Sequence, residues 1–333
     1  MKQKLTMQFN KKIWKLKEEF KTSSRSENTD QAEAIEVIIK KNGYIGRGES
    51  TPYIRYGENI LNSIEELNKI KPFIENGMSR KMLQLKMNPS SARCALDCAM
   101  WDLEAKEKKK KIWQLLKIKR KPTPLNTTES YGIRPLKQLQ VDIEKDNYPS
   151  LIKLKANSEN VLEIVKTVNK ISKHSRLIID FNESLSPNEI IPLSNKLKKF
   201  NIIMLEQPLH EKQDSILSKF KHPIPIGADE SCHTAEDLIK LKSKYDYIII
   251  KPGKCGGLTE AIKLKRLAQK NKFSTMIVCM FGSSLAVAPA YFLSLDGANI
   301  NNIEVPKIML NDRKYKIKCQ KQLIFPPDQR LWG

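Results

Sequence analysis

The sequence predicts a closed barrel of parallel strands that follows a smaller α+β capping domain. From about residue 150 onward, short runs of β-branched residues alternate with stretches of helical periodicity, the pattern of repeated β–α–β units. The polar residues that end five successive runs are 25, 26, 23 and 22 residues apart, so each sits at the same place in its unit. A closed barrel brings such positions to one mouth, whereas an open doubly wound sheet spreads them along a line.

The first third of the chain has a different pattern. Residues 33–40 predict a strand, residues 41–43 (Lys-Asn-Gly) a tight turn, and residues 44–50 a second strand, which together make a β-hairpin. Helical periodicity follows at 59–75 and at 90–118. These elements predict an α+β unit.

The domain boundary is predicted in a basic, polar stretch that Pro122 and Pro124 interrupt. We therefore expect a capping domain over residues 1–121 and a barrel over 122–313. The tail, residues 314–333, is expected to return to the cap.

The repeating units behind the boundary can be assigned one by one. The expected strands are 151–155, 177–180, 202–206, 224–229, 247–251 and 275–279, and the expected helices are 158–173, 187–200, 234–244 and 258–272. Because each strand is followed by a helix, neighbouring strands are expected to run parallel.

The chain carries a large excess of positive charge. Its 333 residues include 59 Lys and Arg against 37 Asp and Glu, a formal net charge of +22. Such a charge suggests a nucleic-acid or membrane partner, but only 11 of these residues are Arg, which base and phosphate recognition favours. The most basic segment, 106–121, has the composition of a solvated helix face. We expect no nucleic-acid or membrane partner; a basic nucleic-acid-binding protein on a catalytically dead barrel is the alternative from another functional class.

Targeting and cysteine patterns suggest a reducing compartment. The N-terminal segment contains lysines but no apolar core of a signal peptide, and no apolar run approaches the ~20 residues of a membrane span. The six cysteines form no C-x-x-C pair and the four histidines are scattered, so neither a disulfide framework nor a zinc site is expected. We expect a cytoplasmic protein with reduced thiols.

Three carboxylates end successive predicted strands: Asp180, Glu206 and Asp229. Oxygen ligands without histidine or cysteine suit a hard divalent cation, Mg²⁺ before Mn²⁺. An acidic residue at a single strand end often only caps the next helix, but three in register at successive units predict a metal site at the barrel mouth.

Three lysines lie within otherwise apolar strand runs. Lys153 and Lys155 alternate across one residue, so both point to one face of a strand. Their mutual repulsion is expected to lower the pKa of at least one, as a general base requires. Lys251 ends a strand four units later, on the opposite side of an eight-stranded mouth. Two bases across a cation predict proton transfer at a carbon next to a carboxylate, with a metal-stabilised enolate and inversion of that carbon.

The sequence then resembles a known family. The motifs that carry the resemblance are Lys-Leu-Lys (153–155), Ile-Asp-Phe-Asn-Glu (179–183), Leu-Glu-Gln-Pro-Leu (205–209), Ala-Asp-Glu-Ser (228–231) and Lys-Pro-Gly-Lys-Cys-Gly-Gly-Leu-Thr-Glu-Ala (251–261), with supporting stretches at 48–58 and 92–103. They resemble the muconate-lactonising subgroup of the enolase superfamily, most of all its dipeptide epimerases, over residues 12–313.

The resemblance implies a (β/α)₇β barrel with a cap that supplies specificity loops near residues 21–31 and 51–57. It implies a Mg²⁺-dependent dipeptide epimerase, an isomerase acting on L-Ala-D/L-Glu from peptidoglycan peptides, and a homo-oligomer. Members of the same subgroup that act as N-acyl amino acid racemases, o-succinylbenzoate synthases or cycloisomerases remain alternatives.

The resemblance also implies a role for each matching residue. Lys155 and Lys251 would be the acid/base catalysts, with Lys153 tuning Lys155; Asp180, Glu206 and Asp229 would bind Mg²⁺; Asn182 and Glu230 would orient these groups; and Arg25 would bind the side-chain carboxylate of a glutamate substrate.

Two positions depart from the family pattern. Where the family usually has Met-x-Glu-Ser/Thr, this chain has Met280-Phe-Gly-Ser-Ser284, which leaves Ser283 as the expected substrate contact. Where dipeptide epimerases have Asp-x-Asp for the substrate ammonium, it has Asn302-Ile303-Glu304. A dipeptide needs an anionic partner for its ammonium and an N-acyl amino acid does not, so Glu304 discriminates between the two readings.

Overall fold

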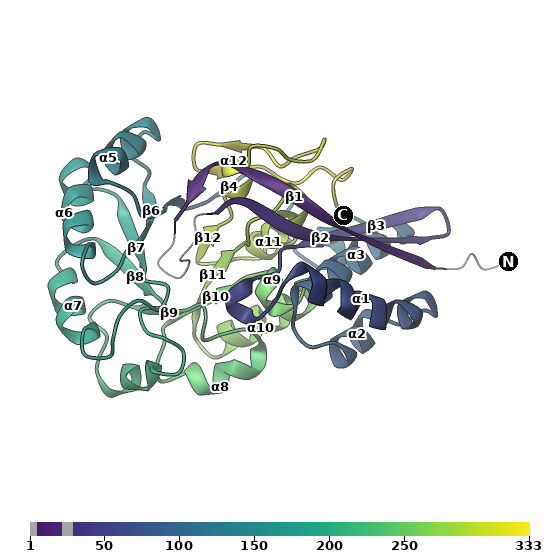
Figure 1. Ribbon diagram of the computed structural model, residues 1–333, viewed down its shortest axis with the longest axis horizontal. Helices are drawn as coiled ribbons and strands as arrows, with labels where there is room; N and C mark the ends of the chain where they lie inside the picture. The colour runs from purple at the N-terminus through teal and green to yellow at the C-terminus, as the bar shows by residue number, and fades with distance from the viewer. Residues whose placement is uncertain (1–4, 22–28) are drawn as a thin grey trace.

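The computed structural model describes residues 5–21 and 29–333 and places a small antiparallel sheet beside a large parallel one (Figure 1). The small sheet has the order β1-β2-β3, with β1 spanning Thr6–Phe20, β2 Thr29–Lys41 and β3 Tyr44–Ser50. The predicted hairpin is confirmed: Lys41 pairs with Tyr44, and Asn42 and Gly43 both have positive φ (51° and 80°), as a two-residue turn that matches strand twist requires.

Strand β1 was not expected from the sequence. It pairs antiparallel with β2 along most of its length, yet its side chains are mostly exposed, with Met7 and Leu16 buried. An edge strand with one weakly apolar face lacks the alternation that identifies a strand.

Helices α1 (Ile60–Glu75) and α3 (Ser91–Glu107) pack on the small sheet, and α2 (Arg80–Lys86) packs against α3. Helix α3 lies so close to β3 that a Cβ at Gly46 or Gly48 would collide with its backbone at Ala99 or Ala95. The single helix expected over 90–118 is wrong in its second half. Lys109 adopts a left-handed conformation (φ 50°), and a separate short helix, α4, spans Ile112–Leu115.

The large sheet contains the eight parallel strands of the expected barrel, in the order β12-β11-β10-β9-β8-β7-β6-β5. The strands are β5 (Glu129–Tyr131), β6 (Leu151–Lys155), β7 (Arg176–Asp180), β8 (Ile202–Glu206), β9 (Ile226–Ala228), β10 (Tyr247–Ile250), β11 (Ser274–Val278) and β12 (Ile300–Asn302). The two end strands meet, since the Thr128 amide donates to the Asn301 carbonyl at 2.8 Å and Asn302 Nδ2 to Ser130 Oγ at 2.8 Å. The predicted (β/α)₇β barrel is thereby confirmed.

Helical segments connect the strands and cover the outside of the barrel (Figure 1). They are α5 (Leu136–Lys145), α6 (Val161–Ile171), α7 (Ile190–Leu197), the 3₁₀ helices η2 (Asp214–Lys219) and η3 (Ala235–Asp237), α8 (Leu238–Leu241), α9 (Pro252–Cys255), α10 (Leu258–Lys270), α11 (Ser284–Leu295) and α12 (Val305–Ile308). The β8–β9 connection thus uses a 3₁₀ helix, and the expected helix over 234–244 is reduced to η3 and α8.

An apolar layer inside the barrel supports the mouth. Ile178, Met204, Ile249 and Met276 belong to one buried cluster within the sheet. Because strand side chains alternate, the residues two positions further along each strand project to the same interior. Those residues are Asp180, Glu206, Lys251 and Val278, so the charged groups lie directly above an apolar floor.

The tail contacts both parts of the molecule. Strands β13 (Cys319–Gln320) and β14 (Leu323–Ile324) form a small sheet with β4 (Leu125–Asn126). Trp332 is fully buried, and its Nε1 donates to the Cys98 carbonyl of α3 at 3.1 Å. These contacts agree with a tail that returns to the cap; the boundary at residue 121 stays a prediction.

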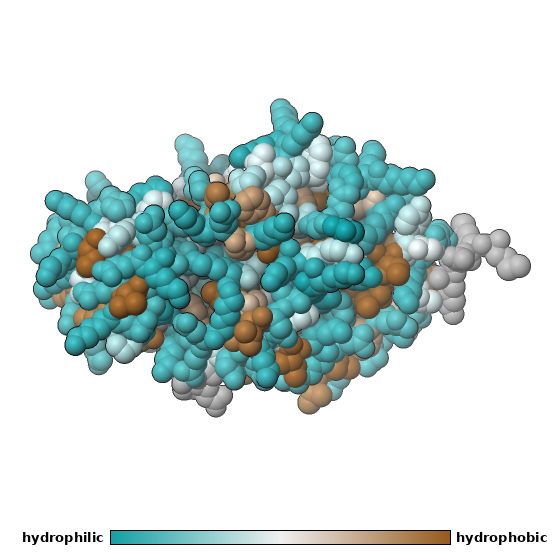
Figure 2. Space-filling view, turned by 90° about the horizontal axis from the view of Figure 1, so that it is seen from above, coloured by the Kyte–Doolittle hydropathy of each residue, from teal (hydrophilic) through white to brown (hydrophobic). Residues whose placement is uncertain are grey.

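The face of the molecule seen in Figure 2 is mostly hydrophilic, with scattered apolar residues. In the described residues, no helix is both long and apolar enough to cross a membrane. The six cysteines, all in this part of the chain, are free.

Candidate active site

The charged residues singled out in the sequence meet at the carboxyl ends of the barrel strands. Lys155 lies opposite Asp180 in the register of β6 and β7, and Asp180 opposite Glu206 in that of β7 and β8. Asp229 and Lys251 directly follow β9 and β10. Successive parallel strands therefore deliver all five residues to one mouth.

Two lysines share one carboxylate of this group. Nζ of Lys153 lies 2.8 Å from both Asp180 Oδ2 and Glu206 Oε1, and Nζ of Lys155 lies 2.5 Å from the same Asp180 oxygen. Lys155 also donates to Asn182 Oδ1 at 2.7 Å. The predicted grouping of both lysines on one face of β6 is confirmed.

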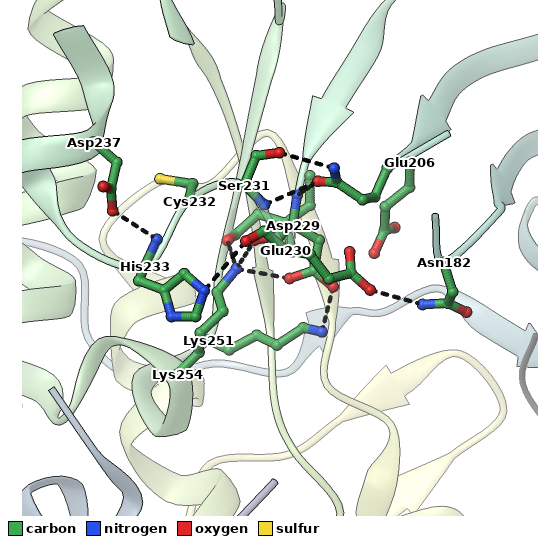
Figure 3. A network of polar contacts seen from close by, with 12 residues as sticks. Asn182, Glu206, Asp229, Glu230, Ser231, Cys232, His233, Asp237, Lys251 and Lys254 are labelled. Atoms are coloured by element: carbon green, nitrogen blue, oxygen red, sulfur yellow. Dashed lines mark hydrogen bonds and ion pairs between the residues drawn. The ribbon is translucent and has the colours of Figure 1, made fainter. Parts of the chain in front are cut away.

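A second lysine pair surrounds Asp229 (Figure 3). Nζ of Lys251 is 2.5 Å from Asp229 Oδ2, and Nζ of Lys254 is 2.7 Å from Oδ1. Lys254 also donates to the Asp229 and Ile249 carbonyls. No role was predicted for Lys254; in a lysine-rich chain its position three residues after Lys251 was its only signal, and burial at 4% exposure is what distinguishes it.

Asn182 and Glu230 connect the two halves of the mouth. Asn182 Nδ2 donates to Glu230 Oε1 at 3.3 Å (Figure 3), while its Oδ1 accepts from Lys155. Glu230 is 3% exposed, and its second oxygen, Oε2, has no hydrogen-bond partner. Asn182 thus contacts both Lys155 and Glu230; that it orients them stays a prediction.

The lysine pairs dominate the electrostatics. Burial alone would lower the pKa of Lys153, but the charges of Asp180 and Glu206 outweigh burial and raise it; Asp229 and Glu230 likewise raise the pKa of Lys251 against burial. Repulsion between the neighbouring ammonium groups was expected to lower the pKa of at least one of them. For Lys153 this expectation is wrong, because two carboxylates 2.8 Å from its Nζ favour the charged form.

The pKa values of the four carboxylates shift in two directions. Burial alone would raise the pKa values of Asp180 and Asp229, but their lysine partners hold both below the usual range. Glu206 and Glu230 go the other way: burial and then neighbouring aspartate charge raise the pKa of Glu206 to about 7 and that of Glu230 to about 8. The mouth thus combines ionised aspartates with glutamates whose charge is unfavourable without a further cation.

The donor set fits a hard cation. In the part of the chain that the structure describes, no three His, Cys, Asp or Glu side chains are already arranged as a metal centre, because the lysines bond to the carboxylate oxygens. Glu206 Oε2, however, is buried without a hydrogen-bond partner, which is costly unless a ligand uses it. Asp180, Glu206 and Asp229 offer oxygen ligands only, as Mg²⁺ prefers.

A cavity of about 100 Å³ opens above these charges. Its lining combines the mouth residues Lys153, Lys155, Asn182, Glu230 and Lys251 with Phe20, Tyr53, Ser130, Val278, Cys279, Met280, Phe281, Asn302, Glu304, Val305 and Ile308. The predicted substrate residues Asn302 and Glu304 line it and bond to each other, Asn302 Nδ2 donating to Glu304 Oε2 at 2.7 Å. Tyr53, which belongs to the expected cap loop at 51–57, and Phe20, which was not predicted, bring the capping domain into the wall.

The structure does not bring Ser283 to this cavity. It is fully buried; its amide donates to Glu49 Oε1 at 2.8 Å, and its Oγ accepts from Arg313 Nε at 2.8 Å. The side chain expected to touch substrate therefore joins the barrel to the cap instead. Arg25, the other predicted substrate residue, lies outside the described residues.

Family comparisons agree with this arrangement. The model described as "Enolase C-terminal domain-like" matches residues 136–329, and that of the mandelate racemase / muconate lactonizing enzyme N-terminal domain matches 4–117. The chain belongs to this enolase-superfamily group. The resemblance inferred from the motifs is confirmed.

Individual relatives are similar over most of the chain. An N-acetyl-D-glutamate racemase from Pseudoalteromonas is 35% identical, covering 90% of this chain and 95% of that protein. The L-Ala-D/L-Glu epimerase of Escherichia coli K12 is 35% identical, covering 82% and 87%. A crystal structure of an enolase family member from Agrobacterium tumefaciens with homology to dipeptide epimerases, with bound sodium and L-Ala-L-Glu, has a TM-score of 0.94 at 30% identity, covering 99% and 100%. Membership together with these relatives makes the chain an isomerase of the enolase superfamily.

Proposed function

We propose that this isomerase inverts the α-carbon of a dipeptide by transferring protons between two lysines, and that its substrate is L-Ala-D/L-Glu. The observation that carries the proposal is the placement of Lys155 and Lys251. Lys155 ends β6, the second strand of the barrel, and Lys251 follows β10, the sixth. Three strands lie between them in an eight-stranded barrel, so the two strands stand half-way round from each other and the two lysines face the cavity from opposite sides; both line it.

The placement of the two lysines on opposite sides determines which of them accepts a proton and which donates one. In one direction, neutral Lys155 accepts the α-proton while charged Lys251 donates a proton to the opposite face of the same carbon; the reverse direction exchanges the two roles. Asn182, which accepts a hydrogen bond from Lys155 Nζ at 2.7 Å, orients that amine. A base must have its proton acceptor aimed at the bond that breaks, so this contact supports Lys155 as one of the two catalysts.

The proposed cofactor is Mg²⁺, with Mn²⁺ as a second hard cation of suitable size, held by Asp180, Glu206 and Asp229. When bound, it would stabilise the negative charge that develops on the substrate carboxylate. The oxygen-only donor set and the unpartnered Glu206 Oε2 support this assignment. Lys153, buried beside Asp180 and Glu206, adds a fixed positive charge for the same carboxylate.

The names of two relatives suggest the substrate class. N-acetyl-D-glutamate and L-Ala-D/L-Glu both contain a glutamate with an acylated nitrogen. We extend the proposal to a glutamate side chain bound by Arg25, to peptides from peptidoglycan turnover, and to a cytoplasmic enzyme that forms homo-oligomers. The positive charge then serves no nucleic acid, and binding of DNA or RNA should be weak and non-specific.

One observation favours a second candidate, racemisation of an N-acyl glutamate. Burial raises the pKa of Glu304, and its Oε2 already accepts from Asn302. A buried carboxyl whose oxygen already accepts from Asn302 is a weaker partner for an ammonium, whereas an acyl group needs no charge opposite it.

One screen tests both candidates. Dipeptides and N-acyl amino acids would be incubated with the enzyme and Mg²⁺ in D₂O, and α-deuterium uptake read by mass. Uptake into L-Ala-Glu at both configurations is the expected result. Uptake confined to N-acetyl-glutamate would select the second candidate, and no uptake with any α-carbon acid would reject the epimerase.

A further inference from the structure

A loop of the capping domain, residues 51–57, reaches over the barrel mouth and contacts it at three points. Thr51 Oγ1 donates to the Phe281 carbonyl at 2.5 Å, beyond β11. Arg55 bonds to Glu183 beyond β7 and to Glu211 beyond β8. The ring of Tyr56 meets the ring of His233, beyond β9, edge to face at 4.6 Å.

The Arg55 contact is the strongest of the three. Its Nε and Nη2 each donate to one carboxylate oxygen of Glu183, both at 2.8 Å, and Nη2 also donates to Glu211 Oε1 at 3.4 Å. Glu183 is nearly buried, at 7% side-chain exposure against 27% for Arg55. A bidentate pair with one buried partner fixes orientation as well as distance.

Glu183 is the immediate neighbour of Asn182, the residue that orients Lys155. Both have positive φ, 43° for Asn182 and 67° for Glu183, a conformation that non-glycine residues rarely adopt. Two backbone contacts hold it: the Asn182 amide donates to Asp180 Oδ1 at 3.0 Å, and the Glu183 amide to the Gln207 carbonyl at 2.8 Å. The bidentate contact from the Arg55 guanidinium then holds the carboxylate of Glu183, the second residue of this strained pair.

The same fork fixes the cap loop. Arg55 belongs to a single 3₁₀ turn, η1 (Ile54–Tyr56), in which no residue is buried, so the turn has little packing of its own to hold it. Tyr53, at its start, lines the cavity and contacts Tyr56 ring to ring at 5.1 Å. The ion pair of Arg55 and Glu183 thus joins the turn that carries Tyr53 to the backbone next to Asn182, which bonds to Lys155.

We propose that Arg55 is a positioning residue: through Glu183 it holds Asn182 against Lys155 and, through its own turn, holds Tyr53 over the cavity. The proposal rests on the two-lysine function above. It assigns Arg55 to the Lys155 side of the mouth, because among the described residues the side-chain hydrogen bonds of Arg55 and Glu183 join them to each other and to Glu211, and none reaches Lys251. Loss of the fork should therefore impair one of the two proton transfers more than the other.

The test compares α-proton exchange of the two substrate epimers in D₂O. The variants Lys155→Ala and Lys251→Ala first identify which epimer each lysine deprotonates. In Arg55→Gln, exchange of the Lys155 epimer is expected to fall roughly tenfold or more relative to the Lys251 epimer, since misplacement of a reacting group by less than an ångström has effects of this size. Arg55→Lys, which keeps the charge but loses the fork, should fall between.

The matched control is Arg80→Gln. Arg80 also pairs with a glutamate, Glu104, but within the cap; the two arginines are similarly exposed (19% for Arg80, 27% for Arg55), while Glu104 is more exposed than Glu183 (27% against 7%), and Arg80 stacks on Trp101. It should leave the ratio of the two exchange rates unchanged. The double variant Arg55→Gln/Glu183→Gln removes the unpaired buried carboxylate and should restore stability but not the ratio.

A second measurement is independent of activity. Amide hydrogen exchange read by mass spectrometry should increase in Arg55→Gln in the peptides covering both 51–57 and 182–184, and in neither for Arg80→Gln. Faster amide exchange in both peptides of Arg55→Gln would support the proposal even if the substrate tested does not react. An unchanged epimer ratio, or unchanged protection at 182–184, would overturn it; absent exchange in the wild type would instead reject the proposed function.

Discussion

The two walls of the mouth differ in how they are built. The wall formed by β6 to β10 is a network of ion pairs: Asp180 and Asp229 each contact two lysines within 2.8 Å. The wall formed by β11, β12 and α12 is largely apolar, with Val278, Met280 and Ile308 among its residues and Asn302 and Glu304 as its polar pair.

We infer that the first wall carries the proton transfer and that the second wall determines which substrate fits. Charges held in mutual contact on rigid strands have little freedom to change without losing the reaction, because each buried charge depends on its partner. The opposite wall has one such pair, Asn302 and Glu304, and otherwise mostly apolar side chains. We therefore expect a single substitution there to alter the fit of a substrate and to leave proton transfer intact. Both departures from the family motifs lie on this side: Gly282 follows β11, and Asn302-Ile303-Glu304 begins at the last residue of β12.

The largest expected effect comes from removing a charge of the first wall. Lys251→Ala should reduce epimerisation by roughly 100- to 10,000-fold, the range for loss of a general acid or base. Exchange of α-hydrogen with D₂O should persist for the epimer that faces Lys155, and Lys155→Ala should show the mirror image, read by NMR of each substrate. Equal loss of exchange for both epimers in either variant would contradict the two-base mechanism.

Removal of the cation is expected to come next in size. Dialysis against EDTA should lower the rate by about 100-fold or more, the scale for losing a stabilising charge at developing negative charge, and Mg²⁺ should restore it. Glu206→Gln should weaken Mg²⁺ binding in calorimetry. Full activity after chelation, with residual metal excluded by elemental analysis, would remove the cation from the mechanism.

A change in the second wall should act on substrate choice. Glu304→Gln is expected to raise KM for L-Ala-L-Glu by about tenfold, the cost of losing a charged hydrogen-bond partner, with kcat and the KM for N-acetyl-glutamate almost unchanged. Asn302→Asp, which restores the family's acidic residue, is the matched variant and should lower KM for the dipeptide. A parallel shift for both substrates would mean that Glu304 holds no ammonium.

The smallest effect concerns an ion pair away from the mouth. His222 Nδ1 lies 2.9 Å from Asp246 Oδ2, and its Nε2 lies 2.8 Å from the Leu217 carbonyl. Burial would lower the pKa of His222, but these acceptors raise it above 6.5. The pair's contribution is therefore complete below pH 6.5 and is lost as pH rises through the raised pKa.

We expect a contribution of less than about 1 kcal/mol, since Asp246 is half-exposed. NMR titration should give His222 a pKa above the usual 6.5, and His222→Gln should flatten the pH dependence of the unfolding free energy between pH 6 and 8 without changing epimerisation. A change in activity across the same range would show that surface charge acts on the mouth.

Local sequence patterns determined the barrel and its charged ring. Strand alternation fixes which side chains face inward, and the period of the β–α unit fixes which of them end their strands, so Lys155, Asp180, Glu206, Asp229 and Lys251 were identifiable without any long-range information. The same local rules identified the hairpin at Asn42-Gly43. The excess positive charge, by contrast, does not identify the site. The lysines of the site are recognised by their positions in the strands, not by the number of lysines in the chain.

Only the tertiary structure decided which partners these residues have. Ser283 bonds to Glu49 and Arg313, Arg55 to Glu183, and Phe20 reaches the cavity from an edge strand that the pattern did not show. The bonded partners are 234 residues apart for Ser283 and Glu49, 128 for Arg55 and Glu183, and 30 for Ser283 and Arg313. Periodicity reports which face of an element is buried, but not which distant segment covers it, so contacts between cap and barrel had to come from the folded chain.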